Sequence, residues 1–165
     1  MKKLTVQNLI LDNSDVENKI QRIGLEILED NIDESKITLF GISDNGKLIA
    51  QKLVTHINKI SDIEIVLIEV VIKNGSIAYN GEFNILDESI VIIGDVSQTG
   101  RTLQLVISNL MQHKPSKIKT SVIINRDQTM YPVKIDYAGL RLSTSVNEHV
   151  DVIVDKKTRL SVYLS

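Results

Sequence analysis

The sequence predicts an α/β protein whose parallel sheet is covered by helices on both faces. Short apolar stretches, typical of strands buried on both faces, alternate with segments in which apolar residues recur every three or four positions. This alternation occurs three times along a chain of 165 residues, the length of one ordinary domain. Because no internal repeat or Pro/Gly-rich linker interrupts it, residues 1–165 are predicted to form a single domain.

The first half of the chain predicts two helices separated by a buried strand. Residues 14–30 are expected to be helical, with Ser14 and Glu17 at the spacing of a capping box. A buried strand is expected at residues 37–42, and the polar residues 43–46 should form a short turn. The helix after that turn carries one apolar face, made of Ile49, Leu53 and Ile57.

The middle of the chain predicts three strands and one further helix. A β-branched run covers residues 63–72, and the Gly- and Asn-containing residues 73–82 indicate a hairpin or a mobile excursion. Residues 89–93 are wholly apolar, as in a strand buried inside a parallel sheet. A helix at residues 102–112 and a strand at residues 118–124 complete the alternation.

The end of the chain predicts a short β segment. From about Ile135 the pattern indicates three short strands, two of which form an alternating pair around Lys156 and Lys157. Ligands of open parallel sheets bind outside the carboxyl ends of the strands. Functional residues are therefore expected where the predicted strands end.

Composition excludes several classes of protein. The 19 basic and 21 acidic residues leave a net charge of −2, without the positive excess that is typical of nucleic-acid binders. No cysteine is present, so disulfides, zinc–thiolate sites and thiol nucleophiles are excluded, and three widely spaced histidines disfavour a histidine-built metal site. The apolar stretches are too short or too interrupted for a membrane span or a signal peptide. We expect a cytoplasmic protein with no membrane partner.

The loop between the 89–93 strand and the next helix carries the strongest functional pattern. Asp95 ends the strand, where its carboxylate could accept hydrogen bonds from sugar hydroxyls or lie near a metal-bound phosphate. Backbone N–H groups and the dipole at a helix start form an anion site, and Gly100 allows close approach of a phosphate. Thr99 and Thr102 add hydroxyl donors. The loop therefore predicts a phosphate site, with a purely structural turn as the alternative.

This loop is not a P-loop. Five residues rather than four separate Gly94 from Gly100, and Arg101 stands where that pattern requires lysine. The dinucleotide pattern G-x-G-x-x-G is also absent there. A different phosphate-binding pattern is required.

The sequence resembles the type I phosphoribosyltransferases. Residues 90–102 are similar to their motif for 5-phosphoribosyl 1-pyrophosphate (PRPP): an apolar strand, an acidic residue and Thr-Gly-x-Thr. Within that group the chain most resembles the pyrimidine operon attenuator/uracil phosphoribosyltransferase family. The supporting stretches are residues 10–12, 20–27, 39–46, 121–126, 137–139 and 142–145. The resemblance covers nearly the whole chain and implies the type I phosphoribosyltransferase fold.

The resemblance also implies roles for individual residues. The 5′-phosphate of PRPP would be bound by six consecutive residues, Ser97, Gln98, Thr99, Gly100, Arg101 and Thr102. Asp95 would hold the ribose hydroxyls and is the catalytic candidate. The pyrophosphate turn would consist of Ser43, Asp44, Asn45 and Gly46, with Arg126 as a further positive charge nearby. Mg²⁺ would enter with PRPP, without a direct protein ligand.

The implied reaction transfers phosphoribose from PRPP to a nucleobase and releases pyrophosphate. Uracil is the first candidate base, which would place the protein in pyrimidine salvage. The partners are then PRPP and a nucleobase or nucleoside 5′-monophosphate. Relatives of this kind usually pair, so a homodimer is expected.

Three departures from the family pattern keep other functions open. Gly94 replaces the first residue of an adjacent acidic pair, which should weaken ribose binding by about 1–3 kcal/mol. Ser43, Asp44 and Asn45 stand where the pyrophosphate turn normally carries basic residues, and the excursion at residues 73–82 is short. A catalytically degenerate sensor of PRPP or a nucleotide is the second hypothesis. RNA-binding attenuation is disfavoured, because the first helix has five acidic residues and two basic ones.

Overall fold

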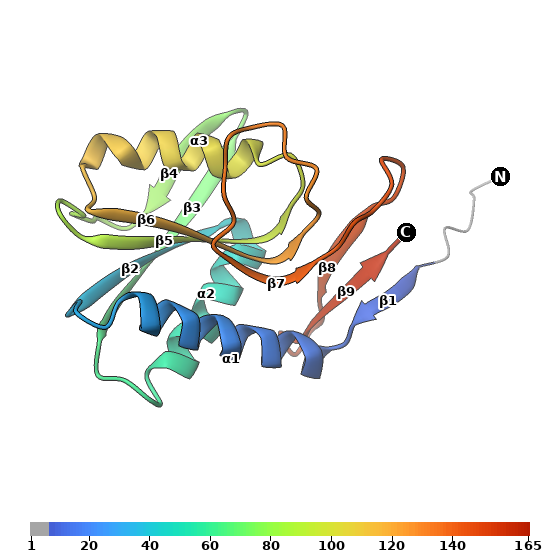
Figure 1. Cartoon of the computed structure of the whole chain (residues 1–165), viewed down its shortest axis with the longest axis horizontal. Coiled ribbons are helices and arrows are strands. Elements are labelled where there is room, and N and C mark those ends of the chain that lie inside the picture. The colour runs from blue at the N-terminus through green and yellow to red at the C-terminus, as the bar shows by residue number, and fades with distance from the viewer. Residues whose placement is uncertain (1–6) are drawn as a thin grey trace.

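The computed structural model describes residues 7–165, which form a six-stranded sheet, a separate three-stranded sheet and three α-helices (Figure 1). The strands of the large sheet are β2 (Lys36–Ile42), β3 (Glu64–Lys73), β4 (Ser76–Asn80), β5 (Ser89–Ser97), β6 (Lys117–Asn125) and β7 (Tyr137–Arg141). The small sheet contains β1 (Asn8–Leu11), β8 (Val150–Val154) and β9 (Leu160–Leu164). The helices are α1 (Asn13–Asp30), α2 (Ser43–Ile57) and α3 (Arg101–Leu110), and a 3₁₀ turn, Met111–His113, follows α3.

The large sheet confirms the predicted fold class. Its strands run in the order β4-β3-β2-β5-β6-β7, and all neighbours are parallel except the β3–β4 hairpin at one edge. Helices α1 and α2 cover one face and α3 covers the other (Figure 1). No helix within residues 7–165 is both long and apolar enough to cross a membrane.

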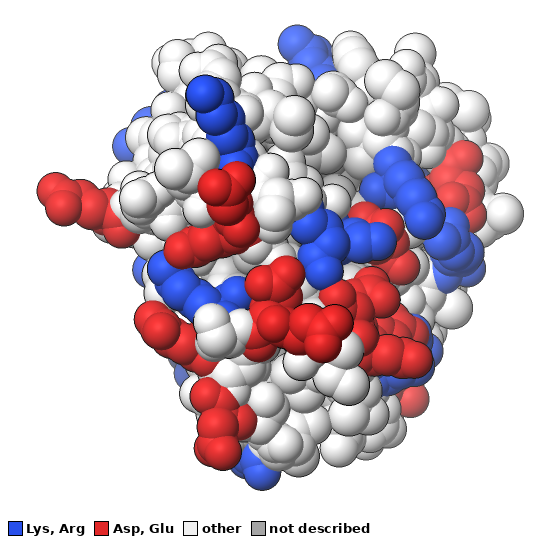
Figure 2. Space-filling view, turned by 60° about the vertical axis from the view of Figure 1, so that its left-hand side comes forward, with Lys and Arg blue, Asp and Glu red and all other residues white. Residues whose placement is uncertain are grey.

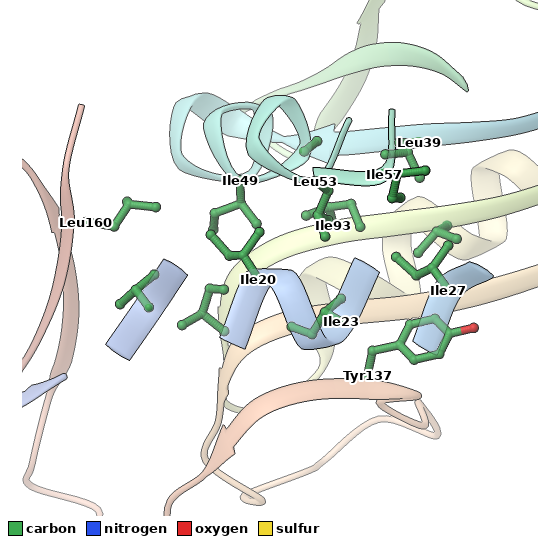
Figure 3. Close-up of a cluster of buried hydrophobic side chains, with 14 of the residues drawn as sticks. Ile20, Ile23, Ile27, Leu39, Ile49, Leu53, Ile57, Ile93, Tyr137 and Leu160 are labelled. Carbon is green, nitrogen blue, oxygen red and sulfur yellow. The ribbon is translucent and has the colours of Figure 1, made fainter. Parts of the chain in front are cut away.

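Strand β5 lies inside the molecule because both of its faces are apolar. Ile90 and Ile92 pack on the side of α3, whereas Val91 and Ile93 pack on the side of α1 and α2. The alternation of side chains along a strand therefore supplies both cores from one uninterrupted apolar run. The larger core is drawn in Figure 3, where Ile20, Ile23 and Ile27 of α1 face Ile49, Leu53 and Ile57 of α2.

The residue that caps the start of α1 is not the predicted one. Asp12, rather than Ser14, is the N-cap: its carboxylate accepts the backbone N–H of Asp15 at 2.8 Å, and Asp15 accepts that of Asp12 at 3.1 Å. The predicted pair of Ser14 and Glu17 therefore does not form the capping box. Two carboxylates at the right spacing make the same reciprocal pattern two residues earlier.

Two boundaries next to the predicted site also differ. Residues 43–46 are not a separate turn but the first turn of α2, which follows β2 directly. The chain can turn this sharply because Gly46 packs on β5: a Cβ there would lie 2.6 Å from the carbonyl oxygen of Ile93. Strand β5 continues to Ser97, which pairs with Asn125, so Asp95 lies within the strand and not at its end.

The tail forms the three strands that were predicted, but they do not join one sheet. Strand β7 extends the large sheet beside β6, while β8 and β9 form a hairpin around residues 155–159. Strand β9 also pairs with β1, which was not predicted, and this closes the small sheet from the two ends of the chain. The small sheet lies beyond the start of α1 (Figure 1).

Candidate functional site

A cleft of about 390 Å³ opens at the carboxyl ends of β2 and β5. Ser43, Asp44 and Asn45 line one part of it from the start of α2. Asp95 from β5 and Thr102 from α3 line another part. The fold thus brings together two segments that lie about 50 residues apart in the sequence, as expected for the ligand site of an open parallel sheet.

The loop before α3 has a backbone that only glycine adopts readily. Gly100 is the N-cap of α3 and has φ 81°, in the left-handed region. The carbonyl oxygen of Thr99 accepts N–H groups from Met130 and Tyr131, at 2.9 and 3.2 Å. The loop is therefore fixed from both sides, by the turn of the helix and by the segment that follows β6.

Several backbone donors of this loop have no acceptor within residues 7–165. They are the N–H groups of Gln98, Thr99, Gly100, Thr102 and Leu103. No side chain caps α3, and Arg101, which is exposed, forms no ion pair with any described residue. Free N–H groups, a helix start and an unpaired cation together favour a bound anion. A phosphate group is one anion that such an arrangement suits.

Asp95 is held by two hydrogen bonds within the protein. One carboxylate oxygen, Oδ1, accepts the N–H of Val96 at 2.7 Å, and the other, Oδ2, accepts the side-chain amide of Asn45 at 2.9 Å. The same amide nitrogen donates to the carbonyl oxygen of Val152 on β8 at 3.1 Å. Asn45 therefore connects the start of α2 to both sheets. The sequence carried no signal for the contribution of Val152, because a backbone carbonyl is common to every residue.

The neighbouring Gly94 leaves room for a Cβ atom. A Cβ at this position would lie 3.5 Å from Val122 Cγ1, an ordinary van der Waals distance. A clash of the Cβ atom therefore does not demand glycine here. The second acidic residue that the family pattern places beside Asp95 is absent.

Among residues 7–165, no lysine or arginine lines the cleft beside the predicted pyrophosphate turn. Asp44 is exposed, and Ser43 has a positive φ of 59°, a strained backbone often found at ligand sites. Lys47, one turn later, is paired with Glu69 of β3 at 3.0 Å. Asn80 donates to the same carboxylate at 2.7 Å, and the hydrogen bonds from Asn80 and Lys47 hold the pKa of Glu69 below its usual value. The charge of Lys47 is thus neutralised away from the turn.

Arg126 has a different environment from the predicted one. Its side chain is buried and does not line the cleft, so it is neither a solvated surface residue nor a cation facing the turn. The guanidinium donates to Thr144 Oγ1 at 2.8 Å and to the carbonyl oxygens of Glu148 and Ser145 at 2.7 and 3.2 Å. Buried charges require such partners. Arg126 therefore orders the loop between β7 and β8.

Comparison with known proteins agrees with this geometry. A family model described as a phosphoribosyl transferase domain matches residues 6–157. The bifunctional protein PyrR of Streptococcus thermophilus is 31% identical over 157 residues, which covers 88% of both chains. The bifunctional protein PyrR of Streptococcus pneumoniae is 28% identical over 151 residues, with 87% of both chains covered.

Two solved structures show the same fold at low sequence identity. The hypoxanthine phosphoribosyltransferase of Trypanosoma cruzi has a TM-score of 0.80, 13% identity and coverage of 95% of each chain. A hypoxanthine-guanine phosphoribosyltransferase from Bacillus anthracis has a TM-score of 0.74 and 14% identity, with 85% of this chain and 86% of that chain covered. The resemblance predicted from residues 90–102 is confirmed.

Proposed function

This chain belongs to the phosphoribosyl transferase domain family, and on that premise we propose that its cleft binds PRPP and transfers the phosphoribosyl group to a nucleobase. The observation that carries the proposal is the set of free backbone donors in the loop before α3 and in the first turn of this helix, between Gln98 and Leu103. A 5′-phosphate would accept from these N–H groups, and the hydroxyls of Thr99 and Thr102 would add further donors. Asp95, in the same cleft, would accept from a ribose hydroxyl.

The proposed reaction exchanges one bond at the anomeric carbon. The bond from this carbon to the pyrophosphate oxygen breaks, and a ring nitrogen of the base forms the new bond while its proton passes to water. Pyrophosphate leaves with the electron pair of the broken bond. The residues of this cleft would contribute mainly by holding the phosphate and the ribose in place while positive charge develops on the sugar. Uracil is proposed as the base because of the family that the sequence resembles.

Mg²⁺ is proposed to enter with PRPP. Within residues 7–165 no three acidic or histidine side chains converge on one point, so these residues alone form no metal cage. The cleft does contain two carboxylates, Asp44 and Asp95. One or two carboxylates together with substrate phosphates are the usual ligands of Mg²⁺, so the residues fit an ion that is bound mostly by substrate. When bound, it would neutralise charge on the leaving pyrophosphate.

A catalytically degenerate sensor is the second candidate, and the pyrophosphate turn favours it. Asp44 brings a negative charge toward a polyanionic leaving group, and Lys47 is occupied by Glu69. A like charge at this place weakens binding of pyrophosphate far more than binding of a nucleoside 5′-monophosphate. In this case the phosphate loop would bind a nucleotide without turnover.

Pyrophosphate release from the full chain separates these candidates. The protein is incubated with PRPP, Mg²⁺ and uracil, hypoxanthine or guanine, and we expect base-dependent release that is largest with uracil. The Asp95→Asn variant should be slower by about tenfold or more, because a charged acceptor is lost. Asp33→Asn, an exposed carboxylate outside the cleft, is the matched control.

If no pyrophosphate is released, binding measured by calorimetry separates the remaining explanations. Binding of PRPP or uridine 5′-monophosphate without pyrophosphate release from any base would reject the enzyme and support the sensor. If neither ligand binds, both candidates are wrong.

A further inference from the structure

Asn45 occupies a place in the predicted pyrophosphate turn, but its contacts connect it to the ribose-binding carboxylate. We propose that the side-chain oxygen of Asn45 is the second acceptor for the ribose hydroxyls, in the role that an acidic residue at Gly94 would otherwise fill. The proposal rests on the proposed function, since it requires a phosphorylated ribose in the cleft. It assigns ribose recognition to a pair of residues from different elements.

The hydrogen bonds of Asn45 fix the orientation of its amide. The nitrogen Nδ2 donates to Asp95 Oδ2 at 2.9 Å and to the carbonyl oxygen of Val152 at 3.1 Å, which uses both of its hydrogens. A flipped amide would place its oxygen against two acceptors, so this orientation is the only satisfied one. The oxygen Oδ1 is therefore directed away from Asp95 and Val152 by the geometry of the amide.

The oxygen Oδ1 is left available to a ligand. No described donor contacts it, and within residues 7–165 no buried side-chain oxygen lacks a hydrogen-bond partner. Oδ1 is therefore accessible to solvent, and Asn45 is one of the residues that line the cleft. An acceptor that is fixed in orientation and still exposed loses little entropy when a hydroxyl group binds to it.

The chemistry of the ribose matches this pair. The 2′- and 3′-hydroxyls are adjacent donors, so they need two acceptors that lie close to each other. The amide nitrogen joins Asn45 to Asp95 at 2.9 Å, so the amide oxygen and the carboxylate belong to neighbouring groups. The pair carries one negative charge, whereas an acidic pair carries two. It therefore favours a sugar diol while adding less repulsion toward the phosphates.

Preference for ribose over deoxyribose tests the proposal without reference to a base. Ribose 5-phosphate and 2-deoxyribose 5-phosphate are titrated into the full chain by calorimetry. We expect the wild type to bind ribose 5-phosphate more tightly, and Asn45→Ala to lose about three- to tenfold of that preference, as for one neutral hydrogen bond. Asn58→Ala, an exposed asparagine at the far end of α2, should behave as wild type.

The two sugar phosphates distinguish ligand recognition from a structural link. If Asn45 acts only by joining the elements, Asn45→Ala lowers the affinities for ribose 5-phosphate and 2-deoxyribose 5-phosphate by the same factor, and the proposal is wrong. Asn45→Ser, which also removes the amide oxygen, should lose the ribose preference in the same way, and it decides the matter if Asn45→Ala does not fold.

Two other outcomes would overturn the proposal. An unchanged preference in Asn45→Ala shows that another group recognises the hydroxyl. A higher affinity of Asn45→Ala for ribose 5-phosphate shows that the amide competes with the sugar for Asp95. In both cases wild-type binding still supports the proposed function. If the wild type binds neither sugar phosphate nor PRPP, the proposed function fails together with this inference.

Discussion

The partners of the charged side chains near the cleft determine which charges can contact a bound ligand. Lys47 and Arg126 are both cations within or beside the segments that resemble the family, yet Lys47 is paired with Glu69 and Arg126 is enclosed by the loop it holds. Neither charge is available to a pyrophosphate in this arrangement. Arg101 is the cation beside the phosphate loop that has no ion pair among the described residues.

Glu17 is a residue whose charge should matter for stability. It lies on α1 and accepts hydrogen bonds from Lys52 and His56 of α2, so it links the two helices that cover one face. Partial burial works to raise the pKa of Glu17, but the hydrogen bonds from Lys52 and His56 outweigh this effect and hold the pKa below its ordinary value of 4.5.

The sign of the pH dependence follows from this lowered pKa. Glu17 stabilises the fold when the pH is above the pKa of this carboxyl in the unfolded chain. This contribution is lost as the pH falls through the lower pKa of the same carboxyl in the folded protein. We expect Glu17→Gln to reduce the free energy of unfolding by about 0.5–1 kcal/mol at pH 7, with the difference disappearing well below pH 4.5. Urea denaturation at several pH values measures it. Glu29→Gln on the same helix is the control, and an equal loss at every pH would contradict the prediction.

Among the elements, the start of α2 depends most on close packing. Strand β2 passes directly into the helix, and Gly46 lies against the backbone of β5. The polar residues of this segment predicted a turn because turn residues and first-turn helix residues have similar compositions. Whether such a segment forms a turn or begins a helix depends on whether the helix can approach the neighbouring strand. Gly46 makes the approach to β5 possible.

Gly46→Ala should therefore destabilise the protein. The new Cβ would lie 2.6 Å from the carbonyl oxygen of Ile93, which forces α2 away from β5. We expect a loss of about 1–3 kcal/mol in the free energy of unfolding, measured by chemical denaturation. Gly24→Ala in α1 is the matched control, because its Cβ would lie 3.5 Å from Ile57 Cγ1 and alanine favours a helix. Equal stability of Gly46→Ala and wild type would show that the backbone can move apart without cost.

On the scale of the whole molecule, the sequence has no excess of basic residues. The face drawn in Figure 2 carries acidic side chains mainly in a band across its middle, with lysine and arginine side chains beside them. This agrees with the net charge of −2. That RNA is not a partner stays a prediction, which a gel shift at low salt would test because phosphate contacts are strongest there.

Ligand binding should stabilise the whole chain. A ligand at about 100 times its Kd adds about 2.7 kcal/mol to the folded state, which for a domain of this size raises Tm by about 5–10 °C. We expect this shift with PRPP or uridine 5′-monophosphate, and little or none with uridine, which lacks the phosphate that the loop before α3 would bind. Thermal unfolding followed by circular dichroism measures it. An equal shift with uridine would show that the base, and not the phosphate, dominates binding.

Features that depend on a pattern of neighbouring residues could be predicted from the sequence. The apolar run of β5, the helical stripes of α1 and α2, and the connection from β5 into α3 each depend on a local pattern, and the structure contains all of them. The parallel sheet followed from their alternation. That residues 97–102 bind a phosphate stays a prediction. Local patterns succeed because strand and helix periodicities are set by the backbone itself.

Tertiary structure alone decided which distant groups meet. The pairing of β1 with β9, the burial of Arg126 and the link from Asn45 to Asp95 and Val152 join residues separated by between 18 and 156 positions. Most of these contacts end on backbone groups, which every residue carries and which leave no signature in a sequence. The sequence therefore predicted a phosphate loop and showed that Gly94 replaces the second acid, while only the folded chain determined that the carboxylate of Asp95 is held by an asparagine.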